Sequence, residues 1–436
     1  MSRPIPFPRT GPTASWLMIL ALVASFCLSS MTLAAIGINY DGVGGNALFK
    51  IHPANWLFAL ALAANLVEQP RPAAYLRRLP RAFPGVTLFA LMTSVTLVFA
   101  ALVQHAPFTP LVDTFFAGIA LLILYEGVAE PMRHRIRFTL HAIMILNACV
   151  GVGEFLAHAR LTPFVVAGAP ILHDERSTAL FGHPLLNAGT TAGYVIALFL
   201  GGSGPARPLG RAALIAVGGA ALVAFGGRTA IVLVAVILAL GSLSRVAGVL
   251  NGRRFDRAGA LALALLTPLL LAGLAVAASK GLFAGFLDRF VEDKGSTQAR
   301  VAIFELFDAF SIEDLLLGPD PARLASLQRR LGIEYGIENS WLGLMFQYGA
   351  LMAGFFVAGL LALFGDIGAR SRRNVGVLIL YFLVLVSGAA SLSVKSFAFN
   401  QFAIVLLVLF DETAPGRRAR AEAPRNPLSF REPLSA

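Results

Sequence analysis

The sequence GSTQARVAIFELFDAF, residues 295–310, lies in the one long polar segment of an otherwise apolar chain. This segment runs from Gly281 to Trp341 and also contains ARLASLQRRLG (residues 322–332) and IENSW (residues 337–341). IENSW leads directly into another apolar stretch. We therefore interpret the rest of the chain as a membrane scaffold that holds the polar segment over a site.

The composition indicates a membrane protein. Of the 436 residues, 57% are hydrophobic and 14% are charged, and the mean hydropathy is +0.74. A soluble protein with this balance would have too few polar residues to cover its surface. The apolar runs are long and continuous, which excludes an outer-membrane β-barrel. The net charge of +11 does not indicate nucleic-acid binding, because the arginines lie mostly in short loops and tails.

The apolar runs predict an all-α, polytopic membrane protein with about twelve transmembrane helices. A spanning helix needs about 20 mainly apolar residues. Twelve segments qualify, near 15–37, 53–69, 84–104, 110–130, 138–156, 185–201, 211–225, 229–244, 259–279, 339–364, 375–391 and 396–410. The predicted organisation is nine spans in 1–280, a large periplasmic loop with amphipathic helices in 281–338, three spans in 339–410, and a disordered cytoplasmic tail in 411–436.

The distribution of positive charge predicts the orientation, because short cytoplasmic loops accumulate Lys and Arg. With the N-terminus inside, the short inner loops carry sixteen such residues: Arg71, Arg77, Arg78, Arg81, Arg133, Arg135, Arg137, Arg207, Arg211, Arg245, Arg253, Arg254, Arg257, Arg370, Arg372 and Arg373. The short outer loops carry five: Lys50, Arg160, Arg176, Arg228 and Lys395. We therefore expect both termini in the cytoplasm and the large loop outside.

Three outward arginines are candidate phosphate ligands. Arg176 precedes the sixth span, Arg228 lies in the tight turn FGGRTA between the seventh and eighth spans, and Arg300 lies in the large loop. Guanidinium stays charged and suits bidentate phosphate binding. Three of them converging at the outer surface would bind a lipid-linked pyrophosphate. Each is equally consistent with a solvated loop arginine or a contact to lipid phosphate.

Polar residues at two span starts are further candidates. Glu338 and Asn339 open the tenth span, and a carboxylate near the membrane surface can act as a general base. The alternative is a helix start, because Asn is a good N-cap and acids favour helix N-termini. His183, at the start of the sixth span, could bond a substrate, but we favour a helix-end role. The adjacent residues 173–175 (HDE) point in different directions, so we expect no metal site there.

Three motifs occur in a recognisable order. They are RSTALFGHPLLNAGTTAGY (176–194), GGRTAIVLV (226–234), and GSTQARVAIFELFDAFSIEDLLLGPDP (295–321) followed by IENSWLGLMFQYGALMAGF (337–355). In this order they resemble the O-antigen ligase and Wzy-type polysaccharide polymerase superfamily of membrane glycosyltransferases. The resemblance covers residues 176–364 well and the remainder by topology.

The resemblance implies an inverting glycosyltransferase of the bacterial inner membrane that acts at the periplasmic face. Its donor would be an undecaprenyl-pyrophosphate-linked glycan, and its other partners would be membrane lipid, a chain-length regulator and export proteins. Arg176, Arg228 and Arg300 would hold the pyrophosphate, with no metal or cofactor, and Glu338 would activate the acceptor hydroxyl. Family ligases often have histidine at the position of Glu338. This departure favours a polymerase of repeat units.

Two alternatives stay open at this stage. A ligase would transfer finished glycan to a lipid or protein acceptor, and the sequence does not separate it from a polymerase. A transporter or flippase of the same lipid would need ionisable residues along a cavity between its halves. Asp113, Glu126, Glu154 and Asp411 all lie near predicted span ends, which weakens the transport alternative.

Overall fold

The computed structural model describes residues 8–42, 44–166, 169–171, 176–202, 208–252, 296–333, 336–371 and 374–411. Within these residues the chain is almost entirely helical, which confirms the predicted all-α class. The departure within that part is one antiparallel pair of two-residue strands, β1 (Val165–Val166) and β2 (Ala169–Pro170). The predicted ninth span, the predicted tail after Asp411 and the 173–175 cluster lie outside the described residues.

Many helices begin at a proline. Proline stands in the first or second position of α1, α3, α5, α7 and α8, where its missing N–H costs nothing and its fixed φ suits the helix. The first helices are α1 (Pro12–Cys27), α2 (Ser30–Ala35), the 3₁₀ helix η1 (Ala47–Lys50), α3 (Pro53–Glu68), α4 (Pro72–Ala82), α5 (Pro84–Leu102), α6 (Thr109–Tyr125) and α7 (Glu130–Ala157). The later ones are α8 (Pro184–Phe199), α9 (Pro208–Phe225), α10 (Arg228–Leu250), α13 (Ser296–Ala309), α14 (Ile312–Leu317), α15 (Pro321–Arg330), α16 (Ser340–Arg370), α17 (Val375–Ser387) and α18 (Ala398–Phe410).

Five of the described helices are long and apolar enough to cross a membrane, namely α5, α7, α9, α10 and α16. The shorter helices α1, α6, α8, α17 and α18 are also apolar. Helices satisfy their own backbone hydrogen bonds, which is what a chain embedded in lipid requires. The structure is therefore that of a membrane-embedded helical protein, while the count of twelve spans stays a prediction.

Several span boundaries differ from the prediction, as in α10, which ends at Leu250, and α16, which ends at Arg370; two differences change the description most. The predicted span 15–37 is divided into α1 and α2, because the chain leaves the first helix and Ser29 caps the second. The predicted span 138–156 begins earlier, at Glu130. The arginines within 133–137, predicted to lie in a loop, are therefore on the first turns of α7.

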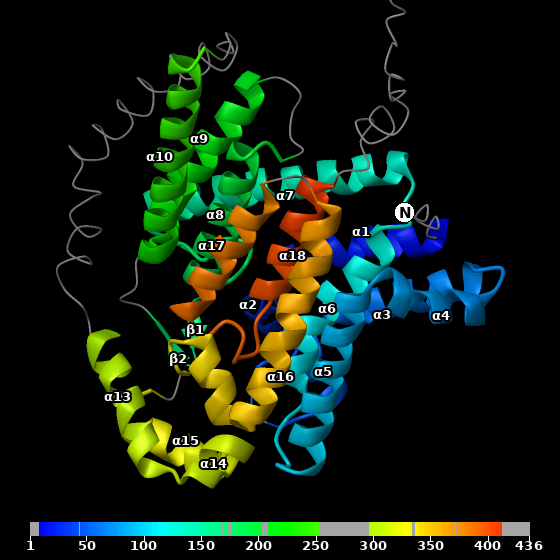
Figure 1. The fold of residues 1–436 in the computed structure, drawn as a ribbon. Coiled ribbons are helices and arrows are strands. Elements are labelled where there is room, and N and C mark those ends of the chain that lie inside the picture. Colours follow the sequence, from blue (N-terminus) through cyan, green and yellow to red (C-terminus); the bar gives the residue numbers. More distant parts are fainter. Residues whose placement is uncertain are drawn as a thin grey trace, which may run out of the picture.

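A sharp break divides α16 at Gly349. Its backbone is non-helical, with φ 84° and ψ 155°, a region that glycine occupies without a steric penalty. A Cβ at this position would lie 2.5 Å from the carbonyl oxygen of Leu316 in α14. Near the break, Gln104 Nε2 donates to the carbonyl of Gln347 at 3.0 Å. The predicted span 339–364 therefore consists of a first segment before Gly349 and a second segment after it, which meet at an angle in Figure 1.

Positively charged residues gather at one end of the helices, which we name the arginine-rich end. There Arg133, near the start of α7, pairs with Asp411, which follows α18. Arg370, at the end of α16, lies 3.6 Å from Glu126, which follows α6. The guanidinium of Arg245, late in α10, donates at 2.7 Å to the last carbonyl of α8. Several arginines predicted to lie in inner loops thus share one end.

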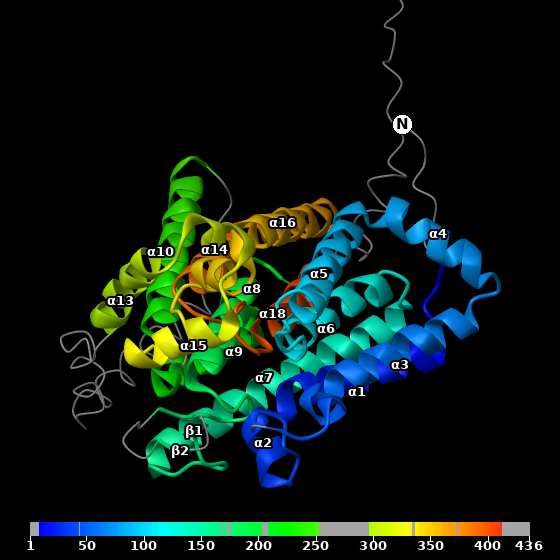
Figure 2. The same ribbon diagram turned by 90° about the horizontal axis from the view of Figure 1, so that it is seen from below.

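The opposite end, which we name the loop end, brings together segments predicted to be outside. Thr114 Oγ1, near the start of α6, donates at 3.1 Å to the carbonyl of Val394 between α17 and α18. In Figure 1 the arginine-rich end points upward, and α13, α14 and α15 lie at the lower left. Figures 1 and 2 together show α1, α3 and α7 crossing behind the upright helices α5, α6 and α16.

Aromatic side chains hold the upright helices together. Phe89 of α5, Phe115 of α6, Phe356 of α16 and Phe399 of α18 are buried, and their ring centroids lie 4.7–5.7 Å apart in the contacting pairs. Edge-on and tilted pairs of this kind each contribute about 0.5–1.5 kcal/mol beyond their burial. A Cβ on Gly85 would lie 2.0 Å from the backbone of α16, so glycine allows α5 and α16 to approach closely.

The helices of the large loop pack on the first segment of α16. The ring centroids of Phe307 and Phe346 lie 4.9 Å apart, and Phe310 contacts the same ring at 6.2 Å. Leu306 is fully buried beside them, whereas Phe304 is 69% exposed. The predicted amphipathic helices are therefore present, and Phe304 faces away from this contact.

Candidate functional site

The segments that carry most of the predicted site residues meet at the loop end. Ser177 N, in the α7–α8 connection, donates at 3.1 Å to a carbonyl in the last turn of α9. The hydroxyl of Tyr381 in α17 donates to the carbonyl of Gly189 in α8 at 2.8 Å. Trp341 Nε1, at the start of α16, donates to Ser387 Oγ at the end of α17 at 2.7 Å. These contacts link α8, α9, α16 and α17 around one region.

Glu154, in the last turn of α7, organises the α7–α8 connection. Its side chain is buried, and Oε2 accepts from Ser177 Oγ at 2.5 Å, Thr178 N at 3.0 Å and Ala179 N at 2.9 Å. Oε1 accepts from Leu161 N at 2.8 Å. A carboxylate with four donors forms strong charge-assisted bonds and fixes the chain on both sides of the connection.

The neighbouring Arg160 fixes the backbone at Arg176. Its Nε and Nη2 donate to the Arg176 carbonyl at 3.2 and 3.0 Å, and its Nη1 donates to the Ile171 carbonyl at 3.1 Å. Its guanidinium also lies 5.5 Å from the centroid of the Phe164 ring. Arg160 therefore anchors this connection, and the half-buried Arg176 is held there through its own carbonyl.

His183 completes the start of α8. Its Nδ1 accepts from Leu185 N at 3.2 Å, and its ring lies edge-on to the ring of Phe164 with centroids 5.4 Å apart. The helix-end role favoured from the sequence is therefore confirmed.

Arg228 is the first residue of α10 and follows a tight glycine turn. Gly226 has a φ of 63°, and a Cβ on Gly227 would lie 2.4 Å from the Cβ of Ala188 in α8. The two glycines therefore allow the start of α10 to lie against the first turns of α8. The half-buried Arg228 is consequently held close to the helix start that His183 caps.

Asn339 caps α16, as the alternative interpretation of IENSW predicted. Its Oδ1 accepts from Trp341 N at 3.0 Å and from Leu342 N at 3.1 Å. Ser340 Oγ donates at 2.7 Å to a carbonyl in the α17–α18 connection and accepts at 3.0 Å from an amide there. Glu338, directly before this anchored start, is exposed. The hydrogen bonds of Asn339 and Ser340 therefore fix the backbone directly after Glu338.

Arg300 belongs to α13, but its side chain lies outside the described part of the structure. The geometry of the site is therefore defined by Arg176 and Arg228, without Arg300. The segments of Arg176 and Arg228 are brought together by α8 and α9. Asn339 joins the same region through α17. Glu154 and Arg160, which shape the site, were not singled out from the sequence as site residues.

A second buried polar cluster at the loop end was also missed. Asp113 of α6 is fully buried and accepts from Tyr40 Oη at 2.8 Å, His52 N at 2.9 Å and Asn55 Nδ2 at 2.6 Å. Lys395 Nζ lies 3.6 Å from its carboxylate, and burial lowers the pKa of this lysine against the opposing effect of the nearby acids. The cluster ties the α2–α3 connection to the α17–α18 connection, and its members are spread over most of the sequence.

Within the described ranges no group of three or more His, Cys, Asp and Glu side chains is placed to hold a metal ion. Arg176 and Arg228 are described cations of the segments that meet at the loop end. The N-termini of α8, α10 and α16 all lie at the loop end, and helix N-termini favour negative charge nearby.

Comparison of the chain with family models, with curated proteins and with solved structures found no match in any of the three. The functional argument therefore rests on the residues of the loop end.

Proposed function

We propose that this protein polymerises oligosaccharide repeat units carried on undecaprenyl pyrophosphate, at the periplasmic face of the bacterial inner membrane. The observation that supports this proposal most directly is the joining of the Arg176 and Arg228 segments through the bond from Ser177 N to α9. Two arginines, one opening α10 and one in the connection before α8, would suit a pyrophosphate at these helix starts. A membrane-embedded scaffold suits a donor with a long lipid tail.

The reaction follows from the roles of these groups. The acceptor hydroxyl oxygen attacks the anomeric carbon of the donor glycan and forms the new glycosidic bond. The bond from that carbon to the pyrophosphate oxygen breaks, and the pyrophosphate leaves with the electron pair on its lipid. Arg176, Arg228 and Arg300 stabilise the charge on the leaving group. The hydroxyl proton passes to the carboxylate of Glu338.

The loop helices add a second supporting observation. Their apolar side chains, including Leu306 and Phe310, pack on the first segment of α16 directly after Glu338 and Asn339. A cover anchored in this way excludes water from one side of the reacting groups, which strengthens electrostatic interactions there. It also leaves entry from the lipid side to the donor.

The test uses the source bacterium lacking this gene, complemented with variants. The variants are Arg176→Ala, Arg228→Ala and Glu338→Gln, and Lys50→Ala is the matched control because it removes a half-buried cation whose Nζ bonds Asn39, away from the proposed site. Undecaprenyl-linked glycans and surface polysaccharide are extracted and sized. We expect single repeat units on the lipid and loss of long polymer in the three site variants, with wild-type polymer in the control.

Other outcomes separate the alternatives. Full-length polymer stranded on the lipid would identify a ligase, and repeat units confined to the cytoplasmic face would identify a transporter. If Arg176→Ala and Arg228→Ala both retain wild-type polymer, the proposed site is wrong. Glu338→His is a useful further variant, because the resembling ligases carry histidine there. It should restore part of the activity that Glu338→Gln loses.

A further inference from the structure

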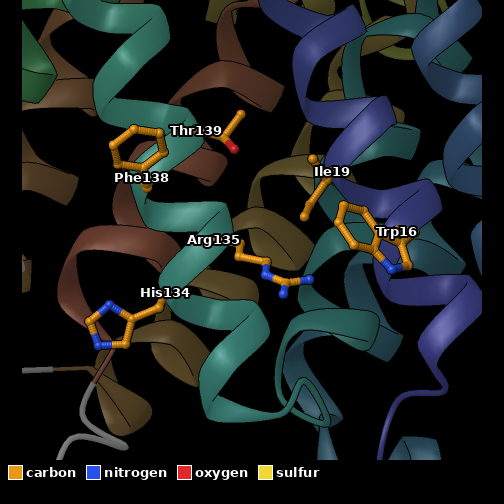
Figure 3. Close-up of a pocket in the computed structure, with 6 residues that line it drawn as sticks. All are labelled: Trp16, Ile19, His134, Arg135, Phe138 and Thr139. Carbon is orange, nitrogen blue, oxygen red and sulfur yellow. The ribbon is translucent and has the colours of Figure 1, made fainter.

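A groove between α1 and α7 lies apart from the proposed site. Its volume is about 460 Å³, and its lining residues, shown in Figure 3, are Trp16, Ile19, His134, Arg135, Phe138 and Thr139. Trp16 is 50% exposed and Phe138 is 74% exposed. The described part of the chain therefore leaves an aromatic and cationic surface open here.

The groove has a positive charge held in place. The Arg135 guanidinium lies 5.1 Å from the centroid of the Trp16 ring, and Figure 3 shows the side chain reaching from α7 toward α1. A guanidinium over an aromatic face gains a cation–π interaction and still presents N–H donors around its edge. His134, one residue earlier, is also exposed at this groove. The arrangement suits a phosphate group.

The groove straddles a boundary between polar and apolar sequence. The first turns of α7, PMRHRIR (131–137), are basic, whereas the following FTLHAIMIL (138–146) is mainly apolar. Trp16 lies in the second turn of α1, and tryptophan favours the membrane–water interface. Exposed Leu20, one turn further along α1, continues the apolar surface into the span. The groove thus has a cationic end and an apolar end along the chain direction.

We propose that this groove binds an anionic glycerophospholipid. Its phosphate contacts Arg135, and an acyl chain lies along Phe138 and Leu20. The occupant is anionic because the cation that lines the groove, Arg135, stands in the basic run PMRHRIR (131–137). A basic cluster beside a spanning helix attracts anionic headgroups in this way. The inference is independent of the proposed polymerase function.

The test is lipid retention by the purified full-length protein in detergent. Phosphatidylglycerol and phosphatidylcholine with identical acyl chains are titrated and bound lipid is counted by native mass spectrometry. We expect the wild-type protein to retain phosphatidylglycerol preferentially. Arg135→Ala should weaken its affinity for phosphatidylglycerol about fivefold, because one cation near the membrane surface contributes about 1 kcal/mol. Arg78→Ala is the matched control, because Arg78 is exposed on α4 at the same end. Trp16→Leu keeps an apolar side chain but removes the ring over which the Arg135 guanidinium lies. It should therefore reduce the preference for phosphatidylglycerol over phosphatidylcholine.

Three results would overturn the proposal. Equal loss of phosphatidylglycerol in the Arg135→Ala and Arg78→Ala variants would mean that the attraction is diffuse. Equal retention of the two lipids by the wild-type protein would mean that the groove does not distinguish an anionic headgroup from a zwitterionic one. Displacement of bound lipid by glycerol phosphate alone would assign the site to a free phosphate. All variants are first required to elute as monodisperse protein, which exposed substitutions permit.

Discussion

Replacing Glu154 by glutamine should destabilise the protein measurably. The carboxylate accepts from Leu161 N through Oε1 and from three donors, including Thr178 N and Ala179 N, through Oε2. Glutamine keeps one acceptor oxygen, so its best orientation serves the three donors and turns its NH₂ toward Leu161 N. One buried amide then loses its acceptor at about 1–3 kcal/mol, and the other bonds lose their charge assistance. The free energy of unfolding should therefore fall by about 2–4 kcal/mol in total.

Thermal unfolding of the purified protein in detergent measures this effect. At about 2 °C per kcal/mol, the midpoint should fall by about 4–8 °C. Glu130→Gln is the matched control, since Glu130 is exposed in the first turn of the same helix. Glu130→Gln should lower the free energy of unfolding by less than about 1 kcal/mol. Equal midpoints for Glu154→Gln and Glu130→Gln would refute the idea that the Glu154 hydrogen bonds hold the α7–α8 connection.

Three further predictions concern single positions. Gly349→Ala should severely reduce the yield of folded protein, because a Cβ there meets α14 at 2.5 Å and φ is 84°; comparison with Gly354→Ala, where a Cβ meets open space, isolates the effect. Asn339→Ala should lower stability by about 1 kcal/mol through the lost cap, and Asn339→Asp should retain most of it. Burial lowers the pKa of His52, just before α3, to about 4. The unfolded chain therefore binds the extra proton first, and stability should fall as pH drops from about 6.5 toward 4, by about 2 kcal/mol at pH 5. In His52→Asn the side-chain oxygen of asparagine can replace Nδ1 as the cap of α3, and stability should depend less on pH. An unchanged slope would exclude His52 as the source of the pH dependence.

Hydropathy predicted the existence of the helices better than their interruptions. Runs of apolar residues gave α3, α5 and α9 nearly at their observed bounds. The same runs concealed the breaks at Ser29 and Gly349, because one small residue barely changes an average over about 20 positions. Each break depends on a local interaction, a cap at Ser29 and a close contact with α14 at Gly349. The contact at Gly349 is tertiary, and neither it nor a single cap at Ser29 leaves a periodic signal.

The site was predictable where a residue acts through its own helix. Asn339 and His183 precede apolar runs, and capping follows from the residue type and position alone. Glu154 gave no comparable signal, because an acid at the end of a span is ordinary and its partners at Ser177 and beyond come 23–25 positions later. Arg160 and Arg176 look alike in sequence. Only the fold shows that Arg160 binds carbonyl groups of the chain.

The two polar clusters of the loop end differ in what they can offer a ligand. Around Asp113 the positive charge of Lys395 faces a carboxylate 3.6 Å away, and both side chains are turned inward. Charge there is largely balanced within the protein. Beside α8, α10 and α16 the arrangement is different, because three helix starts and the chains of Arg176 and Arg228 all contribute positive potential. Glu154 contributes a negative charge nearby, and its oxygens are held by neutral donors of the α7–α8 connection. An anionic substrate is therefore expected at the α8–α10–α16 side, and removing a single arginine there should weaken its binding without reversing the sign of the local field.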